Sequence, residues 1–255
     1  MSQKICLITG GAGFLGKKYC EFFLKNNFKV LCIDNDKKKL SKINSLKLKN
    51  LFTYVCDITD HSKVKKLFKK INSEYFVDVL INNAAIDAIP FKKKEKFEKF
   101  PSSQMWDIEI GVSLKGSFFM IKFFGEEMIK KKRGSIINIG SDLSVIAPNQ
   151  NIYKSSYKNY IKPVTYSVIK HGMLGLTKYF ASLYAKDNVR VNMLSPGPIK
   201  NNQSKKLLGE LRSVIPMGRL AKPDELLGLL LFLANDSSSY VTGQNILVDG
   251  GRTII

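Results

Sequence analysis

Short apolar segments rich in β-branched residues alternate with segments of helical period along nearly the whole chain. We predict strands over residues 4–9, 29–33, 51–55, 77–81, 135–139, 189–194 and 245–248. Helices are predicted over residues 14–26, 36–46, 61–71, 103–131, 165–186, 203–211 and 223–234. Strands that are apolar throughout and are joined through helices form parallel sheets with both faces covered. The pattern therefore predicts an α/β fold with a doubly wound parallel sheet.

The 255 residues show no internal repeat, linker or change of composition, so we predict a single domain over 1–255. A hydrophobic fraction of 44% and a charged fraction of 24% are ordinary for a globular protein. The longest apolar run, 226–234, is too short to cross a bilayer. A strand-like run begins at Ile5, which leaves no room for a signal peptide. We expect a cytoplasmic protein without membrane contacts.

Four cysteines, Cys6, Cys20, Cys32 and Cys56, lie in or beside apolar strands or in a helix, without CxxC spacing. Because free cysteine behaves as a small hydrophobic residue, we predict buried structural thiols and no metal site.

The formal net charge of +20 raises the question of nucleic-acid binding. However, only five of the 41 basic residues are arginine, and the lysines are spread over the whole chain in doublets and triplets. Base readout relies on arginine, and phosphate-binding surfaces usually concentrate charge on one element. We predict no specific nucleic-acid partner, although polyanions should retain the protein non-specifically at low salt.

A glycine-rich turn, Thr9 to Gly16 (TGGAGFLG), lies between the first predicted strand and the first predicted helix. Gly10, Gly13 and Gly16 permit a tight turn whose backbone N–H groups approach a pyrophosphate at the helix N-terminus. An acidic residue at the end of the next strand completes the pattern of a dinucleotide site. The turn thus predicts a Rossmann-type sheet with a bound dinucleotide.

That acidic residue is Asp34, 18 positions after Gly16. A carboxylate there can hold both ribose hydroxyls of NAD and repels the 2′-phosphate of NADP. Asp34 could instead cap a helix, and Lys37 to Lys39 could weaken the discrimination against the 2′-phosphate of NADP. We predict NAD as the cofactor and regard NADP as the less favoured alternative.

Tyr166 and Lys170 lie four residues apart within a predicted helix and therefore on one helix face. A free phenol has a pKa near 10, and a nearby cation favours the phenolate and lowers that pKa toward the range useful for catalysis. On spacing alone the pair could equally be a tyrosine that packs on a lysine stem.

Over essentially its whole length the chain resembles the short-chain dehydrogenase/reductase family, in its compact single-domain branch. Besides the glycine turn and the Tyr166/Lys170 pair, the matching segments are Asp57-Ile58, Asn82 to Ala85, Ile137 to Ser141, Arg190 to Asn192, Ser195 to Ile199, Ser239 to Gly243 and Val248 to Gly251.

The resemblance implies roles for individual residues. Ser141 would bind the substrate oxygen, Tyr166 would exchange a proton with that oxygen, and Lys170 would hold the nicotinamide ribose and lower the pKa of the tyrosine. Other residues would contact the cofactor, with Asp57 and Ile58 at the adenine. The full implied set is Gly10, Gly13, Phe14, Leu15, Gly16, Asp34, Asp57, Ile58, Asn83, Ala84, Ala85, Tyr166, Lys170, Pro196, Gly197 and Ile199.

Three features depart from the family pattern. The glycine turn has the TGxxGxxG spacing typical of the epimerase/dehydratase branch, with Phe14 where the compact branch usually has glycine. Ser113, seven residues after Trp106, occupies the position of the family's proton-relay asparagine. About a dozen extra residues separate Ser141 from Tyr166, and similar insertions occur in relatives associated with bacterial surface-sugar pathways.

Two connections, at about 86–101 and 142–164, leave the C-terminal ends of strands, where α/β sheets bind ligands. The first holds five lysines in 16 residues, and the second carries Tyr153, Tyr157 and Tyr160. Charge and ring stacking suit a phosphorylated or nucleotide-linked sugar. The alternative is a solvated run of charge without a ligand.

We expect an NAD(H)-dependent oxidoreductase that moves a hydride between nicotinamide and a hydroxyl/carbonyl substrate. Two alternatives stay open, a sugar epimerase or dehydratase that retains its NAD, and a non-catalytic cofactor-sensing protein. Free NADH released during turnover would exclude the first, and turnover itself the second. The resemblance also implies a homo-oligomer, a dimer or tetramer, through the segment Val248 to Gly251.

Overall fold

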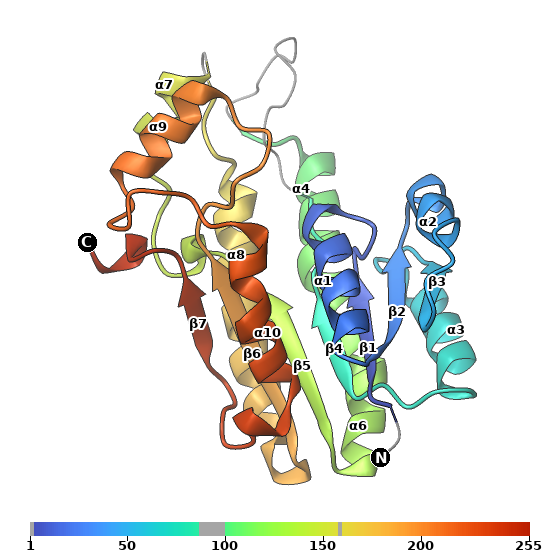
Figure 1. Cartoon of the computed structure of the whole chain (residues 1–255). Helices are drawn as coiled ribbons and strands as arrows, with labels where there is room; N and C mark the ends of the chain where they lie inside the picture. Colours follow the sequence, from blue (N-terminus) through green and yellow to red (C-terminus); the bar gives the residue numbers. More distant parts are fainter. Residues whose placement is uncertain (1–2, 87–99, 158–159) are drawn as a thin grey trace.

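Seven parallel strands form one sheet in the order β3-β2-β1-β4-β5-β6-β7 in a computed structural model that describes residues 3–86, 100–157 and 160–255 (Figure 1). Their bounds are β1 Ile5–Thr9, β2 Lys29–Asp34, β3 Leu51–Val55, β4 Val79–Asn82, β5 Gly134–Ile139, β6 Val189–Pro196 and β7 Asn245–Val248. The chain leaves β1 in one direction and returns at β4 in the other. The crevice beside β1 and β4 is thus the topological switch point, where open α/β sheets bind ligands.

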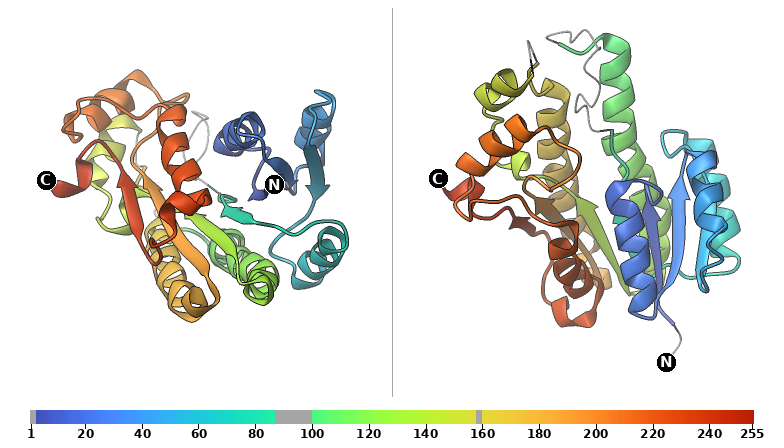
Figure 2. Two further views of the ribbon diagram at one scale, coloured as in Figure 1. Left: turned by 60° about the horizontal axis from the view of Figure 1, so that its bottom comes forward. Right: turned by 45° about the horizontal axis from the view of Figure 1, so that its top comes forward.

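Helices cover both faces of the sheet (Figures 1 and 2). The apolar sides of α1 (Phe14–Lys25), α2 (Lys37–Asn44) and α10 (Leu227–Ala234) pack on one face. The other face is covered by α3 (His61–Asn72), by the helical stretch from Ser103 to Lys131 and by α8 (Val164–Tyr184). Since both faces are covered, β4 is buried at all four of its residues. This is the predicted doubly wound Rossmann-type fold.

Two stretches of the chain depart from the predicted elements. The stretch 103–131 is helical as predicted, but π-helical turns, Gly111–Lys115 and Ile121–Gly125, separate α4 (Ser103–Ile110), α5 (Gly116–Met120) and α6 (Glu126–Lys131). The connection 142–164 was predicted as a loop, which is wrong for part of its length. It contains a 3₁₀ turn, Asp142–Ser144, and the helix α7 (Gln150–Ser156), whose first turn is capped by the side chain of Asn149.

Helix α7 packs against α9 (Lys205–Ser213) above the C-terminal edge of the sheet, at the top of Figure 1. The two helices have a small core of their own, which includes Ile152, Tyr153, Leu207 and Leu211. We call α7 and α9 together the cap. Short 3₁₀ turns at Ala185–Asp187, Pro223–Leu226, Asp236–Ser238 and Arg252–Ile254 complete the described elements.

All four cysteines are reduced and buried, as predicted. Burial raises the pKa of the Cys6 thiol well above its usual value and that of Cys56 to about 11, so both stay protonated and unreactive. Within the described residues no group of histidine, cysteine and acidic side chains has the arrangement of a metal site.

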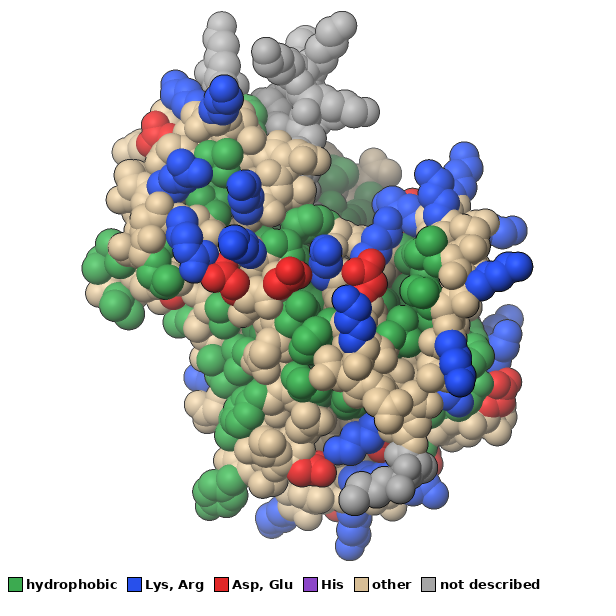
Figure 3. Space-filling view, viewed as in Figure 1, with side chains coloured by type: hydrophobic (Ala, Val, Ile, Leu, Met, Phe, Trp, Pro, Cys, Tyr) green, Lys and Arg blue, Asp and Glu red, His purple; other side chains and the backbone are tan. Residues whose placement is uncertain are grey.

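No helix in the described part of the chain is long and apolar enough to span a membrane. On the face drawn in Figure 3, lysine and arginine side chains gather over the cap at the upper left and again at the upper right, with fewer acidic side chains among them.

Candidate active site

The glycine turn follows β1 and opens into a cavity of about 460 Å³, which we call the turn cavity. Gly10 has a φ of +61°, and a Cβ there would lie 2.8 Å from the Cα of Ala84. A Cβ on Gly16 would lie 2.1 Å from the carbonyl oxygen of Gly10. Only glycine satisfies both positions, and the backbone of the turn is thereby held at the N-terminus of α1.

Asn83 and Thr9 fasten the turn to the end of β4. The side-chain amide of Asn83 donates to the carbonyl oxygens of Thr9 and Gly10, at 3.0 and 3.1 Å. In return, the Thr9 hydroxyl accepts from the backbone N–H groups of Asn83 and Ala84. Sequence reasoning missed the neighbouring Asn82, which donates to Asn138 of β5 at 2.8 Å within the sheet.

Asp34 ends β2 at the mouth of the turn cavity. One carboxylate oxygen accepts from the N–H of Ala12 at 3.0 Å, and the other accepts from the N–H of Asp36 at 3.0 Å. The side chain is therefore fixed against the turn. Asp36, and not Asp34, caps α2, where it also pairs with Lys39 at 3.1 Å. This ion pair offsets the charge of Lys39, which, of the three lysines Lys37 to Lys39, is the one that lines the turn cavity.

The remaining residues expected near adenine also lie in the turn cavity. Asp57 accepts from the N–H and the hydroxyl of Thr59, so it also serves as the turn cap that was its structural alternative. Ile58 is buried against Gly116, where a Cβ would approach the Ile58 side chain to 2.7 Å. Of the residues expected to contact the cofactor, those that line the turn cavity are Gly10, Gly13, Phe14, Leu15, Asp34, Asp57, Ile58, Asn83, Ala84 and Ala85. Gly16 does not line the cavity and packs against the backbone of Gly10 and Gly11.

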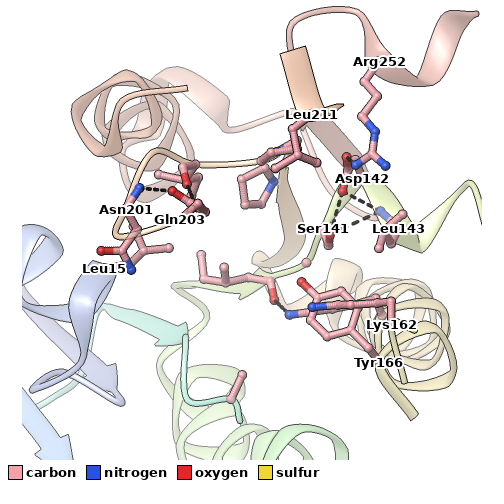
Figure 4. Close-up of a pocket in the computed structure, with 18 of the residues that line it drawn as sticks. Leu15, Ser141, Asp142, Leu143, Lys162, Tyr166, Asn201, Gln203, Leu211 and Arg252 are labelled. Atoms are coloured by element: carbon pink, nitrogen blue, oxygen red, sulfur yellow. Dashed lines mark hydrogen bonds and ion pairs between the residues drawn. The ribbon is translucent and has the colours of Figure 1, made fainter. Parts of the chain in front are cut away.

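A second cavity of about 240 Å³, which we call the tyrosine cavity, lies under the cap. Ser141, Tyr166 and Lys170 line it together with Pro196, Gly197 and Ile199 (Figure 4). The two cavities share Phe14, Leu15, Asn83, Ala85 and Asn201 in their walls. An extended ligand can therefore run from Asp34 past the glycine turn to Tyr166.

Lys170 is buried, and its ammonium donates to the carbonyl oxygen of Ile139 at the end of β5, at 3.1 Å. Its nitrogen lies 5.5 Å from the ring centroid of Tyr166. Tyr166 itself is half-buried, in the first turn of α8. The structure thus brings the phenol and the ammonium together, as the helical spacing predicted.

Ser141 follows β5 and belongs to a hydrogen-bonded turn. Its hydroxyl donates to Asp142 at 2.8 Å and accepts from the N–H of Leu143 at 3.2 Å. The other carboxylate oxygen of Asp142 forms an ion pair with Arg252, and both side chains are about 95% buried. Figure 4 shows Arg252 reaching into the wall of the cavity beside Ser141. Neither member of this pair was singled out from the sequence.

Ser113 lies apart from these groups. It is buried in the first π-helical turn and is not among the described residues that line either cavity. The buried polar contact between this helical stretch and α8 is made instead by Glu109, whose carboxylate accepts from the hydroxyl of Thr165. This contact could not be predicted from the sequence, because Glu109 resembles any other carboxylate on a helix.

The cap and the segments beside it contribute further groups to the tyrosine cavity. Tyr153, Tyr157 and Tyr160 line the tyrosine cavity, as does the buried Lys162. Asn201 and Gln203 line it from the segment before α9. The lysine-rich part of the connection 86–101, with Lys92 to Lys99, lies outside the described residues.

Comparison with known proteins agrees with this geometry. A family model described as enoyl-(acyl carrier protein) reductase matches residues 12–253. The chain is 36% identical to 3-oxoacyl-[acyl-carrier-protein] reductase of Thermotoga maritima, over 100% of this chain and 99% of that protein. It is 31% identical to NAD-dependent glycerol dehydrogenase of Listeria innocua, over 100% and 95%.

Among solved structures, a short chain dehydrogenase from Leptospira borgpetersenii with bound NAD+ superposes with a TM-score of 0.87. The two are 31% identical, and the match covers 99% of this chain and 94% of that one. The chain therefore belongs to the short-chain dehydrogenase/reductase family, oxidoreductases that use a nicotinamide cofactor and act on hydroxyl and carbonyl groups.

Proposed function

We propose that this protein transfers a hydride between NAD(H) and a hydroxyl/carbonyl substrate held under the cap. The observation that carries the proposal is the continuity of the two cavities, which join a glycine cradle to the Tyr166/Lys170 pair. The residues present fit a dinucleotide, because Gly10 and Gly13 line the turn cavity at the N-terminus of α1, where a pyrophosphate would be held. When bound, the nicotinamide supplies or accepts the hydride.

The chain's own residues carry out the proton transfer. In the oxidation direction the Tyr166 phenolate accepts the proton of the substrate hydroxyl, and in reduction the phenol returns it to the carbonyl oxygen. Ser141 binds that oxygen by turning its hydroxyl proton from Asp142 to the substrate, while the N–H of Leu143 holds the Ser141 oxygen in place. Lys170 holds the nicotinamide ribose and favours the phenolate. Pro196, Gly197 and Ile199 bound the nicotinamide end.

NAD is the proposed cofactor because Asp34 presents a fixed carboxylate at the ribose end of the turn cavity. In an Asp34→Asn variant we expect the ratio of kcat/KM for NADH over NADPH to fall by on the order of tenfold, since one charge repulsion is removed. Asp60→Asn, at the exposed N-cap of α3, is the matched control. An NADPH preference in the unaltered protein would refute the assignment.

For the substrate we propose an anionic, hydroxyl-rich molecule such as a phosphorylated or nucleotide-linked sugar. Lys162, Lys170 and Arg252 in the wall outnumber the single carboxylate of Asp142, and Asn201 and Gln203 offer amides. Three tyrosines provide stacking surfaces. The reaction would then belong to carbohydrate metabolism.

A second candidate is a 3-oxoacyl thioester, favoured by the 36% identity to an acyl-carrier-protein reductase. A substrate panel of polyols, sugar phosphates, nucleotide sugars and 3-oxoacyl thioesters, followed by NADH absorbance, separates the two. NADH released or consumed in the assay also excludes an epimerase or dehydratase that retains its cofactor. Cofactor binding without turnover on any member would favour the non-catalytic alternative.

We also propose a homo-oligomer, a dimer or tetramer. Val168, Tyr179 and Leu183 form one exposed stripe along α8, with Tyr179 65% exposed, and Trp106 and Phe118 are exposed on the neighbouring helices. A Tyr179→Glu/Leu183→Glu double variant should shift the mass measured by light scattering to a smaller species. Leu46→Glu, which lies outside this stripe and is 61% exposed, should not. An unaltered protein that is already monomeric would contradict the proposal.

A further inference from the structure

A second lysine contacts the ring of Tyr166. Lys162 lies four residues before the tyrosine, in the connection that enters α8, and its side chain is buried with 5% exposed. Its ammonium nitrogen lies 3.8 Å from the Tyr166 ring centroid, closer than the 5.5 Å of Lys170. Figure 4 shows the Lys162 side chain lying along the ring at the edge of the cavity. The acid–base role given to Lys170 does not account for this cation.

The position of Lys162 is fixed by the cap. The side-chain amide of Gln150, the first residue of α7, makes two hydrogen bonds to the Lys162 backbone. Its oxygen accepts from the Lys162 N–H at 2.8 Å, and its nitrogen donates to the Lys162 carbonyl at 3.2 Å. Pro163 follows directly and caps α8. The extra residues before Tyr166 therefore place a cation on the ring, and they do so through a defined contact.

Other charged and titratable groups in the described part of the chain also lie around Tyr166 or on the elements packed against it. Asp142 and Arg252 form a buried pair and largely offset one another. The Glu109 carboxylate accepts a hydrogen bond from the hydroxyl of Thr165, the residue before Tyr166. The phenols of Tyr153, Tyr157 and Tyr160 line the same cavity. On α8, Lys170 lies one turn away, and His171 is exposed and bonds the carbonyl of Ser167.

We propose that Lys162 is a second cation that favours the phenolate form of Tyr166, and that it acts as a positioning residue for proton transfer. The inference rests on the acid–base role proposed for Tyr166. A cation on the face of an aromatic ring is attracted by its π electrons, and the attraction grows when the phenol loses its proton and the ring gains charge. Burial limits solvent screening of this interaction.

The consequence concerns the pH at which the enzyme works. With two cations against the ring, a larger share of Tyr166 is phenolate near neutral pH, ready to accept the substrate proton. Removing the charge of Lys162 leaves Lys170 as the only cation recorded against this ring in the described part of the chain. The pKa of Tyr166 then rises, and the activity in the oxidation direction moves to higher pH.

The test measures the phenol directly and needs no substrate. Full-length protein is labelled with ¹³C at tyrosine Cζ, the Tyr166 signal is assigned with Tyr166→Phe, and each variant is titrated by NMR. We expect Lys162→Met to raise the pKa of Tyr166 by on the order of one pH unit. Lys162→Arg keeps the charge and should titrate close to the unaltered protein. Lys178→Met removes an exposed lysine from the same helix and should change nothing.

Gln150→Ala keeps every charge but releases the Lys162 backbone, so it should produce a smaller rise of the same sign. It also covers the case in which Lys162→Met does not fold. The inference is overturned if the Tyr166 titration is unchanged in Lys162→Met while Lys170→Met raises the pKa of Tyr166. Where Lys162→Met does not fold, the same result in Gln150→Ala overturns it. Either result leaves the proposed function unaffected. Turnover that survives Tyr166→Phe would instead overturn the proposed function, whatever the titrations show.

Discussion

Tyr166→Phe is expected to lower kcat by about 10²- to 10⁴-fold on whichever panel substrate the protein turns over, because general acid–base transfer contributes about that much. The ring still fills the wall of the tyrosine cavity and still faces Lys162 and Lys170, so only the proton-bearing oxygen is lost. NADH binding, followed by fluorescence, should change little. A loss in kcat without a loss of cofactor affinity assigns the tyrosine to chemistry and not to folding.

The matched control is Tyr75→Phe. Tyr75 also has a lysine on its ring, with the Lys29 nitrogen 4.5 Å from the centroid, but it precedes β4 and lies among neither set of cavity-lining residues. Its kcat should equal that of the unaltered protein. Comparable losses in both variants would mean that removing any phenol perturbs the fold, and an unchanged Tyr166→Phe would exclude Tyr166 as the proton carrier.

Arg252→Met is expected to lower the free energy of unfolding by about 3–5 kcal/mol, the usual cost of leaving one member of a buried ion pair without its partner. Asp142 and Arg252 are 97% and 95% buried, so solvent does little to screen the Asp142 carboxylate once it has lost its partner. Because Asp142 also orients Ser141, the variant should lose activity under conditions where it remains folded. Urea unfolding measures the first effect.

Asp142→Asn combined with Arg252→Met provides the control. Since the double variant buries no unpaired charge, it should recover part of the stability lost in Arg252→Met. Together with the single variants it completes a double-mutant cycle, which gives the coupling free energy between the two residues. Arg219→Met breaks an exposed bidentate pair with Glu225 and should cost much less stability than Arg252→Met, because solvent screens the exposed pair. Equal losses for Arg219→Met and Arg252→Met would contradict the role given to burial.

The fold could be predicted from the sequence because its strands are short, apolar and regularly spaced between helices. Leu51–Val55 and Asn245–Val248 are observed with the predicted bounds, and the other strands differ by at most two residues at either end. Helix α7 was missed because its evidence is tertiary. Ile152 and Tyr153 pack on Leu207 and Leu211, which lie more than fifty residues away in the sequence.

The same distinction between local and tertiary evidence applies to the residues of the site. The glycine turn, Asp34, and the Tyr166/Lys170 pair could be predicted because their chemistry depends on local spacing. Lys162 and Arg252 could not, since a lysine in a chain with 41 basic residues carries little information until its burial is known. Ser113, a position inferred from family spacing, is not among the described residues that line either cavity, and its relay role stays a prediction.

A crystal structure of the full chain with NAD+ would show whether one dinucleotide occupies both cavities. We expect the pyrophosphate on the turn from Gly10 to Gly16 and the adenosine ribose hydroxyls on Asp34. The nicotinamide should lie between Pro196 and Tyr166, with Lys170 on its ribose. A dinucleotide found elsewhere, or one whose nicotinamide points away from Tyr166, would contradict this expectation.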